Sequence, residues 1–216
     1  LSGALRNVLA VLIPVCLWMM LAAEPIIRLI YEQGRFSPAF TGETALLLRI
    51  MLAGVAFWGV QQLIGRAFYA RQDTLTPALI GTAATAITLP FYWLLSRAFG
   101  ASGIAVAGVL GVCLYTIILT LIWRRRTGEG TLTHLGRHAG AVLGISLSAA
   151  VPSALGAYAV SRVQAGHPLL LALASIAVSG ILFALAYIVI ARRYAPPLLA
   201  PLLAPLPVRL RKRLLP

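Results

Sequence analysis

The stretch RAFYARQDTLTP, residues 66–77, lies between two long apolar runs and is itself polar, with two arginines, a glutamine, an aspartate and two threonines. Backbone groups that leave a helix inside lipid would lack hydrogen-bond partners, so the chain reverses between spans at the membrane surface. A short polar segment between apolar runs therefore predicts a turn between two membrane-spanning helices.

The composition supports this interpretation. The 216 residues are 60% hydrophobic and only 11% charged, with a mean hydropathy of +0.92, whereas soluble proteins are roughly 25% charged. Six apolar runs each approach the ~20 residues that cross a ~30 Å hydrocarbon core. They are apolar on every side rather than alternating, which favours helices over barrel strands. We expect an all-α, polytopic transmembrane helix bundle with six spans: Val8–Ile30, Ala45–Tyr69, Pro77–Leu95, Ile104–Trp123, Ala139–Val160 and Leu169–Ile190.

Three prolines mark expected helix starts, because proline is favoured at the first helical position. They are Pro38 after Ser37, Pro77 after Thr76, and Pro168 after His167. The hydroxyls of Ser37 and Thr76 are expected to cap free N–H groups.

The 18 Lys and Arg residues predict the orientation, since basic residues are retained on the cytoplasmic side. Six spans place both chain ends on one side, which carries Arg6, Arg66, Arg71, Arg124, Arg125, Arg126, Arg137, Arg192, Arg193, Arg209, Arg211, Lys212 and Arg213. The other side and the outer part of the second span carry Arg28, Arg35, Arg49, Arg97 and Arg162. Both ends are therefore expected to be cytoplasmic.

The net charge of +13 does not indicate nucleic acid binding, because the basic residues gather at span ends rather than on a soluble face with interleaved aromatics. After Ile190, repeated prolines exclude a regular helix. The basic tail that follows, with Arg209, Arg211, Lys212 and Arg213, is expected on the anionic inner leaflet. A solvated, disordered tail is the alternative.

Small residues at four-residue spacing form two further patterns, Gly103, Ala107 and Gly111, and then Gly140, Gly144 and Ser148. Such faces let helices approach closely in lipid. Packing within one bundle and contact between protomers both remain open as explanations.

Polar side chains inside the spans are few and concentrate in the second one. Arg49, Gln62 and Arg66 are candidate substrate-binding residues that could line a cavity, although snorkelling arginines and glutamines paired to other helices would give the same pattern. Asp73 would share a face with Gln62 and Arg66 if the helix continued to it.

No catalytic constellation is present: the sequence has no paired carboxylates, no nucleophile beside a base and no phosphate-binding glycine loop. There is no metal-ligand set and no sign of a cofactor. Transport or scaffolding is therefore favoured over enzymatic activity.

The stretch 66–77 resembles the signature of the lipid II flippases, the MviN/MurJ family of the multidrug/oligosaccharidyl-lipid/polysaccharide exporter superfamily. EPIIRLIYEQGRFSPAFT at 24–41 and GASGIAVAGVLG at 100–111 are similar to other segments of that family, and the ordered similarity covers roughly residues 5–125. The motif residues are Arg66, Phe68, Tyr69, Asp73, Thr74, Thr76 and Pro77.

The resemblance implies a protein of fourteen spans, of which these six correspond to the ninth to fourteenth. It divides the chain into four helices of the C-terminal lobe (1–125), two further helices (126–194) and a Pro-rich basic cytoplasmic tail (195–216). The missing partner is an N-terminal lobe, which carries most of the family's substrate-binding arginines.

The implied function is transport of lipid II across the bacterial cytoplasmic membrane by alternating access, for cell wall synthesis. Lipid II, or a similar polyprenyl-pyrophosphate glycan, and membrane lipids are the expected partners, and the chain is expected not to transport alone. Three alternatives stay open: export of another polyprenyl-linked glycan or amphiphile, a membrane enzyme, for which the sequence shows no polar active-site cluster, and a membrane scaffold without transport.

Overall fold

The computed structural model of the chain describes residues 1–32, 38–128, 133–162 and 168–199, and these ranges contain helices but no strand. The elements are α1 (Ser2–Leu21), α2 (Ala23–Tyr31), α3 (Pro38–Ala70), α4 (Leu75–Thr127), α5 (Thr133–Ser161), α6 (Pro168–Tyr194) and the short 3₁₀ helix η2 (Pro196–Leu199). Within these ranges, five helices are long and apolar enough to cross a membrane. The predicted all-α, polytopic helical fold is confirmed.

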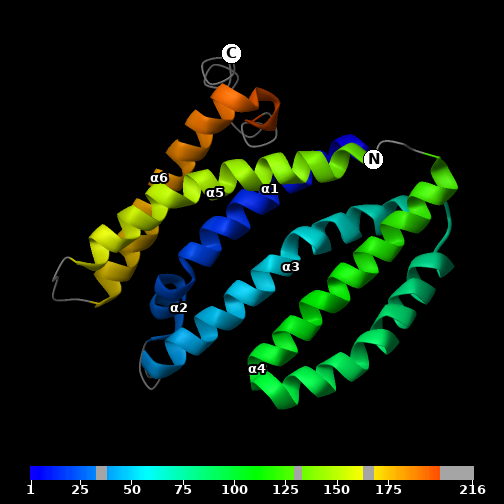
Figure 1. The fold of residues 1–216 in the computed structure, drawn as a ribbon, viewed down its shortest axis with the longest axis horizontal. Helices are drawn as coiled ribbons and strands as arrows, with labels where there is room; N and C mark the ends of the chain where they lie inside the picture. The colour runs from blue at the N-terminus through cyan, green and yellow to red at the C-terminus, as the bar shows by residue number, and fades with distance from the viewer. Residues whose placement is uncertain (33–37, 129–132, 163–167, 200–216) are drawn as a thin grey trace. The chain divides into compact units, whose positions relative to one another are not determined.

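The longest helix, α4, is a hairpin of two arms, 75–99 and 101–127, that meet at Gly100 (Figure 1). Tyr92 lies against Gly108 and Thr88 against Gly111, so the arms run antiparallel. A straight helix of 53 residues would be about 80 Å long, far more than a ~30 Å hydrocarbon core requires. Each arm suits one crossing, and together they account for the third and fourth predicted spans.

The first predicted span, Val8–Ile30, is wrong as a single helix. Helix α1 ends at Leu21 and α2 begins at Ala23. Pro25 explains the break, because it has no N–H to donate to the carbonyl of Leu21, and its ring crowds that carbonyl. Helices α3 and α6 begin at Pro38 and Pro168 as predicted.

The chain divides into two compact units, each described by itself. Unit 1 comprises Leu1–Leu12 and Ile50–Ala139, and unit 2 comprises Ile13–Arg49 and Gly140–Pro216. In unit 1, α3 packs along the second arm of α4, with Gly54 against Val109 and the hydroxyl of Thr116 donating to the carbonyl of Phe57 at 3.2 Å.

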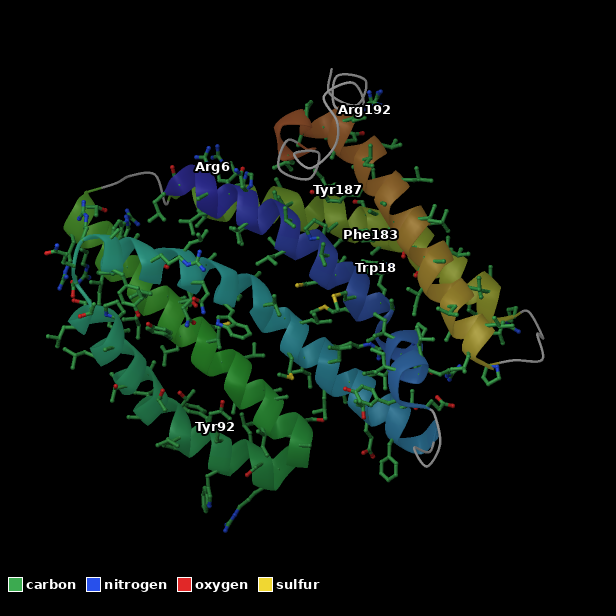
Figure 2. The ribbon with its side chains drawn as sticks, turned by 180° about the vertical axis from the view of Figure 1, so that it is seen from behind. Arg6, Trp18, Tyr92, Phe183, Tyr187 and Arg192 are labelled. Carbon is green, nitrogen blue, oxygen red and sulfur yellow. The ribbon has the colours of Figure 1, made fainter. Side chains whose placement is uncertain are left out.

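In unit 2, α1, α5 and α6 meet around Ser179. The indole Nε1 of Trp18 donates to the Ser179 hydroxyl at 3.4 Å, and the Ser153 hydroxyl donates to the Ser179 carbonyl at 2.9 Å. Gly180 lets the Trp18 ring approach the α6 backbone. Figure 2 labels Trp18 of α1 and Tyr187 of α6. The Tyr187 hydroxyl is buried and has no hydrogen-bond partner among the described residues.

The two small-residue patterns have different outcomes. Gly103 and Ala107 are buried and Gly111 packs against Thr88, so this face serves packing within the α4 hairpin. Both explanations stay open for the second pattern, whose three members are exposed in the described chain: Gly140, Gly144 and Ser148. Spacing alone does not determine whether a neighbouring helix is present.

The turn at Gly100 generates a first prediction. Gly100 has φ 59° and ψ −133°, a combination that residues with a Cβ rarely adopt. Because nothing lies within 4 Å of an added Cβ, the effect of Gly100→Ala is a backbone effect. We expect it to destabilise the hairpin by about 1–3 kcal/mol, measured as a lower thermal unfolding midpoint of the intact protein in detergent.

The matched control is Gly144→Ala, at a helical and exposed glycine that also has open space around it. Alanine stabilises a helix interior relative to glycine by about 0.5–1 kcal/mol, so the midpoint should stay the same or rise. Equal midpoints for the two variants would show that the Gly100 conformation does not hold the hairpin.

Candidate functional site

Helix α3 ends in a hydrogen-bonded turn that contains most of the RAFYARQDTLTP stretch. The N–H of Asp73 donates to the carbonyl of Phe68 at 3.1 Å, and the N–H of Gln72 donates to that of Tyr69 at 2.9 Å. This pair of bonds is a Schellman motif, in which Gln72, with φ 61°, occupies the left-handed position that glycine usually takes. The predicted turn between two helices is thus present at this stretch.

The Asp73 side chain accepts hydrogen bonds from the first turn of the next helix. Its Oδ1 accepts the backbone N–H of Thr76 at 2.9 Å, and its Oδ2 accepts the Thr76 hydroxyl at 2.7 Å. The predicted role of Thr76 as the cap before Pro77 is wrong, because α4 begins at Leu75 and Thr76 is the donor. This hydrogen bond to an N–H three residues later satisfies a free donor as an N-cap side chain does, although Thr74 holds the N-cap position.

The same carboxylate forms an ion pair with the far end of the hairpin. Arg126 Nη1 lies 2.5 Å from Asp73 Oδ2. We call these three residues, Asp73, Thr76 and Arg126, the Asp73 network. The hydrogen bonds from Thr76, and after them the bond from Arg126, hold the pKa of the Asp73 carboxyl below its ordinary value. The carboxylate therefore stays charged at neutral pH.

An aromatic stack lies on the other side of the turn. The guanidinium of Arg71 lies over the Trp123 ring, 5.0 Å from its centroid. Trp123 meets Phe68 edge to face, with centroids also 5.0 Å apart and planes at 75°. Phe68 and Trp123 are buried and Arg71 is exposed. The stack therefore attaches the end of α3 to the last turns of α4 and leaves a cation at the surface.

A groove of about 680 Å³ runs from this turn along the first arm of α4. It is lined by Tyr69, Pro77, Ala78, Gly81, Thr82, Thr85, Ala86, Leu89 and Tyr115. The Tyr115 hydroxyl donates to the Pro77 carbonyl at 3.1 Å, which joins the second arm to the start of the first.

The candidate substrate-binding residues belong to different units of the chain. Gln62 and Arg66 are exposed one turn apart on α3 in unit 1, and neither bonds to another described residue. Arg49 belongs to unit 2, where its Nε donates to the Met20 carbonyl at 3.1 Å. Asp73 does not share a helix face with Gln62 and Arg66, because α3 ends at Ala70, before Asp73.

The motif residues mainly build the turn. Phe68 and Pro77 are buried, Tyr69 lines the groove, and Asp73 and Thr76 belong to the Asp73 network. Thr74 is exposed and makes no side-chain cap. Sequence reasoning missed Trp123, Tyr115 and Arg126 as their partners. The only signal for Arg126 was its place in a run of three arginines at a span end.

Two other predictions concern the C-terminal tail and metal binding. The membrane-surface residues of the tail lie outside the described residues: Arg209, Arg211, Lys212 and Arg213. Within the described ranges, no group of three or more His, Cys, Asp or Glu side chains could hold a metal ion.

Comparisons with known proteins give a consistent result. The sequence model of a family described as lipid II flippase MurJ matches residues 1–177. A probable lipid II flippase MurJ of Rhizobium meliloti is 30% identical over 119 residues, which cover 54% of this chain and 22% of that protein. The lipid II flippase MurJ of Thermosipho africanus is 29% identical over 116 residues, 52% of this chain and 24% of that protein. The matched part thus spans less than a quarter of each relative.

The Asp73 network generates a second prediction. Asp73→Asn keeps a side-chain oxygen that can accept the Thr76 N–H but loses the ion pair with Arg126. Asp73→Ala loses both this hydrogen bond and the ion pair. We expect the thermal midpoint of the intact protein to fall from wild type to Asp73→Asn and further to Asp73→Ala. As a control, Glu43→Gln removes an exposed carboxylate from α3 and should leave the midpoint unchanged.

The same network sets a pH dependence. The pKa of Asp73 is lower in the folded state than in the unfolded state. The Asp73 carboxylate therefore stabilises the folded protein fully above the unfolded pKa of about 3.9, and this stabilisation is lost as the pH falls through the folded pKa. The difference in thermal midpoint between wild type and Asp73→Asn should therefore be constant around neutral pH and shrink below about pH 4. A difference that grows in acid would contradict this assignment.

Proposed function

This chain belongs to the lipid II flippase MurJ family, and we propose that it forms part of a transporter that moves lipid II across the bacterial cytoplasmic membrane for cell wall synthesis. The observation that carries the proposal is the family match over residues 1–177, which includes the whole turn built by the RAFYARQDTLTP stretch. The proposed activity is transport and not a chemical conversion of the substrate.

Physical chemistry explains why such a substrate needs a protein. A pyrophosphate bearing sugars cannot enter hydrocarbon unaided, because charged and polar groups lose their hydration there. We propose alternating access, in which the polar head crosses through a protein cavity while the polyprenyl tail stays in the bilayer. An inside-negative potential favours outward movement of the anion by at most about 2.3 kcal/mol per charge per 100 mV.

We propose that α1 to α4 correspond to the end of the C-terminal lobe, within residues 1–125, that α5 and α6 are the two further spans within 126–194, and that 195–216 form a cytoplasmic tail. Both ends of the chain then face the cytoplasm, and an N-terminal lobe completes the transporter. The α3–α4 turn, at residues 70–75, lies on the cytoplasmic side in this arrangement.

Within this function, Gln62 and Arg66 are the described groups on α3 of unit 1 that are free to meet an anionic head, since both are exposed and unbonded among described residues. Arg49 is the third candidate. The Asp73 network has a different role. It holds the two ends of the α4 hairpin together, so that both arms move as one element.

The function is tested by depleting the full-length protein in the cell and labelling lipid II with a membrane-impermeant reagent. We expect externally accessible lipid II to fall while total lipid II stays constant or rises. Unchanged accessibility would reject lipid II transport. If the accessible pool of another polyprenyl-linked glycan falls instead, the substrate assignment is wrong and the transport assignment holds.

The role of the Asp73 network gives a separate prediction. Arg126→Gln removes the ion pair with Asp73, whereas Arg125→Gln removes a neighbouring exposed arginine for which no bond is found in the described chain. We expect Arg126→Gln to slow lipid II externalisation by the full-length protein several-fold at equal expression, and Arg125→Gln to leave it unchanged. Equal rates for both variants would show that the ion pair does not limit transport.

A further inference from the structure

Helices α1 and α5 each pass from one compact unit of the chain into the other. Helix α1 leaves unit 1 after Leu12, and α5 leaves it after Ala139. Both passages lie inside a helix and not in a loop. Any change in the orientation of the two units therefore requires α1 and α5 to bend near these residues.

Both helices are bonded on each side of the passage. In unit 1, Nε2 of His138 on α5 lies 3.1 Å from the carbonyl oxygen of Arg6 on α1. In unit 2, the Trp18 indole of α1 donates to the Ser179 hydroxyl, and the Ser153 hydroxyl of α5 donates to the Ser179 carbonyl. Figure 2 labels Arg6 and Trp18 on α1. Bending is thus confined to the segments between these bonds.

Helix α1 contains a proline in this segment. Pro14 has no N–H to donate to the Ala10 carbonyl, and its ring crowds that carbonyl. Sharp kinks in helices are found most often at such prolines. Because Pro14 follows closely after Leu12, α1 is easiest to bend where it passes between the units.

Helix α5 contains two glycines in the corresponding segment, Gly140 and Gly144. Glycine weakens a helix interior, because its backbone loses more conformational freedom on folding than that of alanine. A close neighbour would explain the choice of glycine, but no described atom lies within 4 Å of a Cβ added at either position. Gly140 is also the first residue of α5 in unit 2. The two glycines make α5 easy to bend at its passage.

Helix α3 is the third connection and has a different sequence. It passes between the units at Arg49 and Ile50, and residues 46–53 contain neither proline nor glycine. Its backbone hydrogen bonds therefore continue through the passage. Helix α3 can stay continuous while the other two helices bend.

We propose that Pro14 in α1 and Gly140 with Gly144 in α5 form a hinge at which the two units change their orientation. Helix α3 is the continuous element about which they turn. The hinge is a property of the fold and goes beyond the proposed function, because it does not depend on which substrate is transported. It also gives a role to two glycines of the second small-residue pattern.

Distance measurements by electron paramagnetic resonance on the full-length protein in nanodiscs test the hinge. Nitroxide labels at Arg125→Cys in unit 1 and Arg193→Cys in unit 2 report the orientation of the units, after Cys16 and Cys113 are replaced by alanine. We expect a broad distance distribution in this labelled protein. Gly140→Ala combined with Gly144→Ala should narrow it, because alanine strengthens the helix at the passage.

The matched control is Gly42→Ala combined with Gly65→Ala. Both glycines lie in α3, away from its passage between the units, and nothing described lies within 4 Å of an added Cβ at either. The control pair should leave the width of the distribution unchanged.

The proline half of the hinge has its own matched pair. Pro14→Ala restores an N–H for the Ala10 carbonyl and should narrow the distance distribution. Pro90→Ala makes the same change inside α4, within unit 1, and should leave the distribution unchanged.

Hydrogen exchange gives a second readout in the same protein. Amides of residues 141–148 of α5 should exchange faster than those of residues 176–186 of α6. Each alanine at Gly140 or Gly144 should slow the exchange of this α5 segment by about two- to fivefold.

The proposal is overturned by a narrow, single distance in the labelled protein. It is also overturned if Gly140→Ala with Gly144→Ala, or Pro14→Ala, leaves the distribution unchanged. Equal narrowing by the control pair would show that general helix stabilisation sets the width. None of these measurements involves lipid II, so the hinge and the proposed function can fail separately.

Discussion

A peptide N–H or C=O without a partner in hydrocarbon costs several kcal/mol, and this constraint governs each place where the chain reverses. The chain reverses in different ways at the two ends of the α4 hairpin. At residues 70–76, α3 closes with a Schellman motif, and the Asp73 carboxylate accepts a free N–H group in the first turn of α4. At Gly100 the chain reverses through a single glycine with a positive φ, and both arms remain helical up to that residue.

These two turns give the hairpin unequal support. The Gly100 turn depends on backbone conformation and on close packing beside it, where Gly103 approaches the Leu95 carbonyl so closely that an added Cβ would lie 1.9 Å from the oxygen. The opposite end depends on side chains: Asp73 with Arg126, and Arg71 with Trp123. A change of charge at Asp73 or Arg126 therefore weakens the turn side of the hairpin and leaves the backbone conformation of Gly100 unchanged.

Hydropathy predicted the spans well, because 20 apolar residues in a helix are what a bilayer requires. It failed at Pro25, where a proline inside an apolar run removed one hydrogen bond and divided the first span. The partners of the turn were not predictable, since Arg126 lies 53 positions after Asp73 and only the fold of the α4 hairpin brings them together. The Gly140 pattern could not be assigned a neighbour for a related reason: spacing describes one helix and not the helices around it.

The positions of the motif residues separate two roles that a family motif can have, building a structure and binding a substrate. Phe68, Asp73, Thr76 and Pro77 bond or pack within the turn, whereas Arg66 is exposed at one end of the same stretch. A stretch of twelve residues thus combines a framework with an exposed cation. The framework therefore fixes the place on α3 at which Arg66 is exposed.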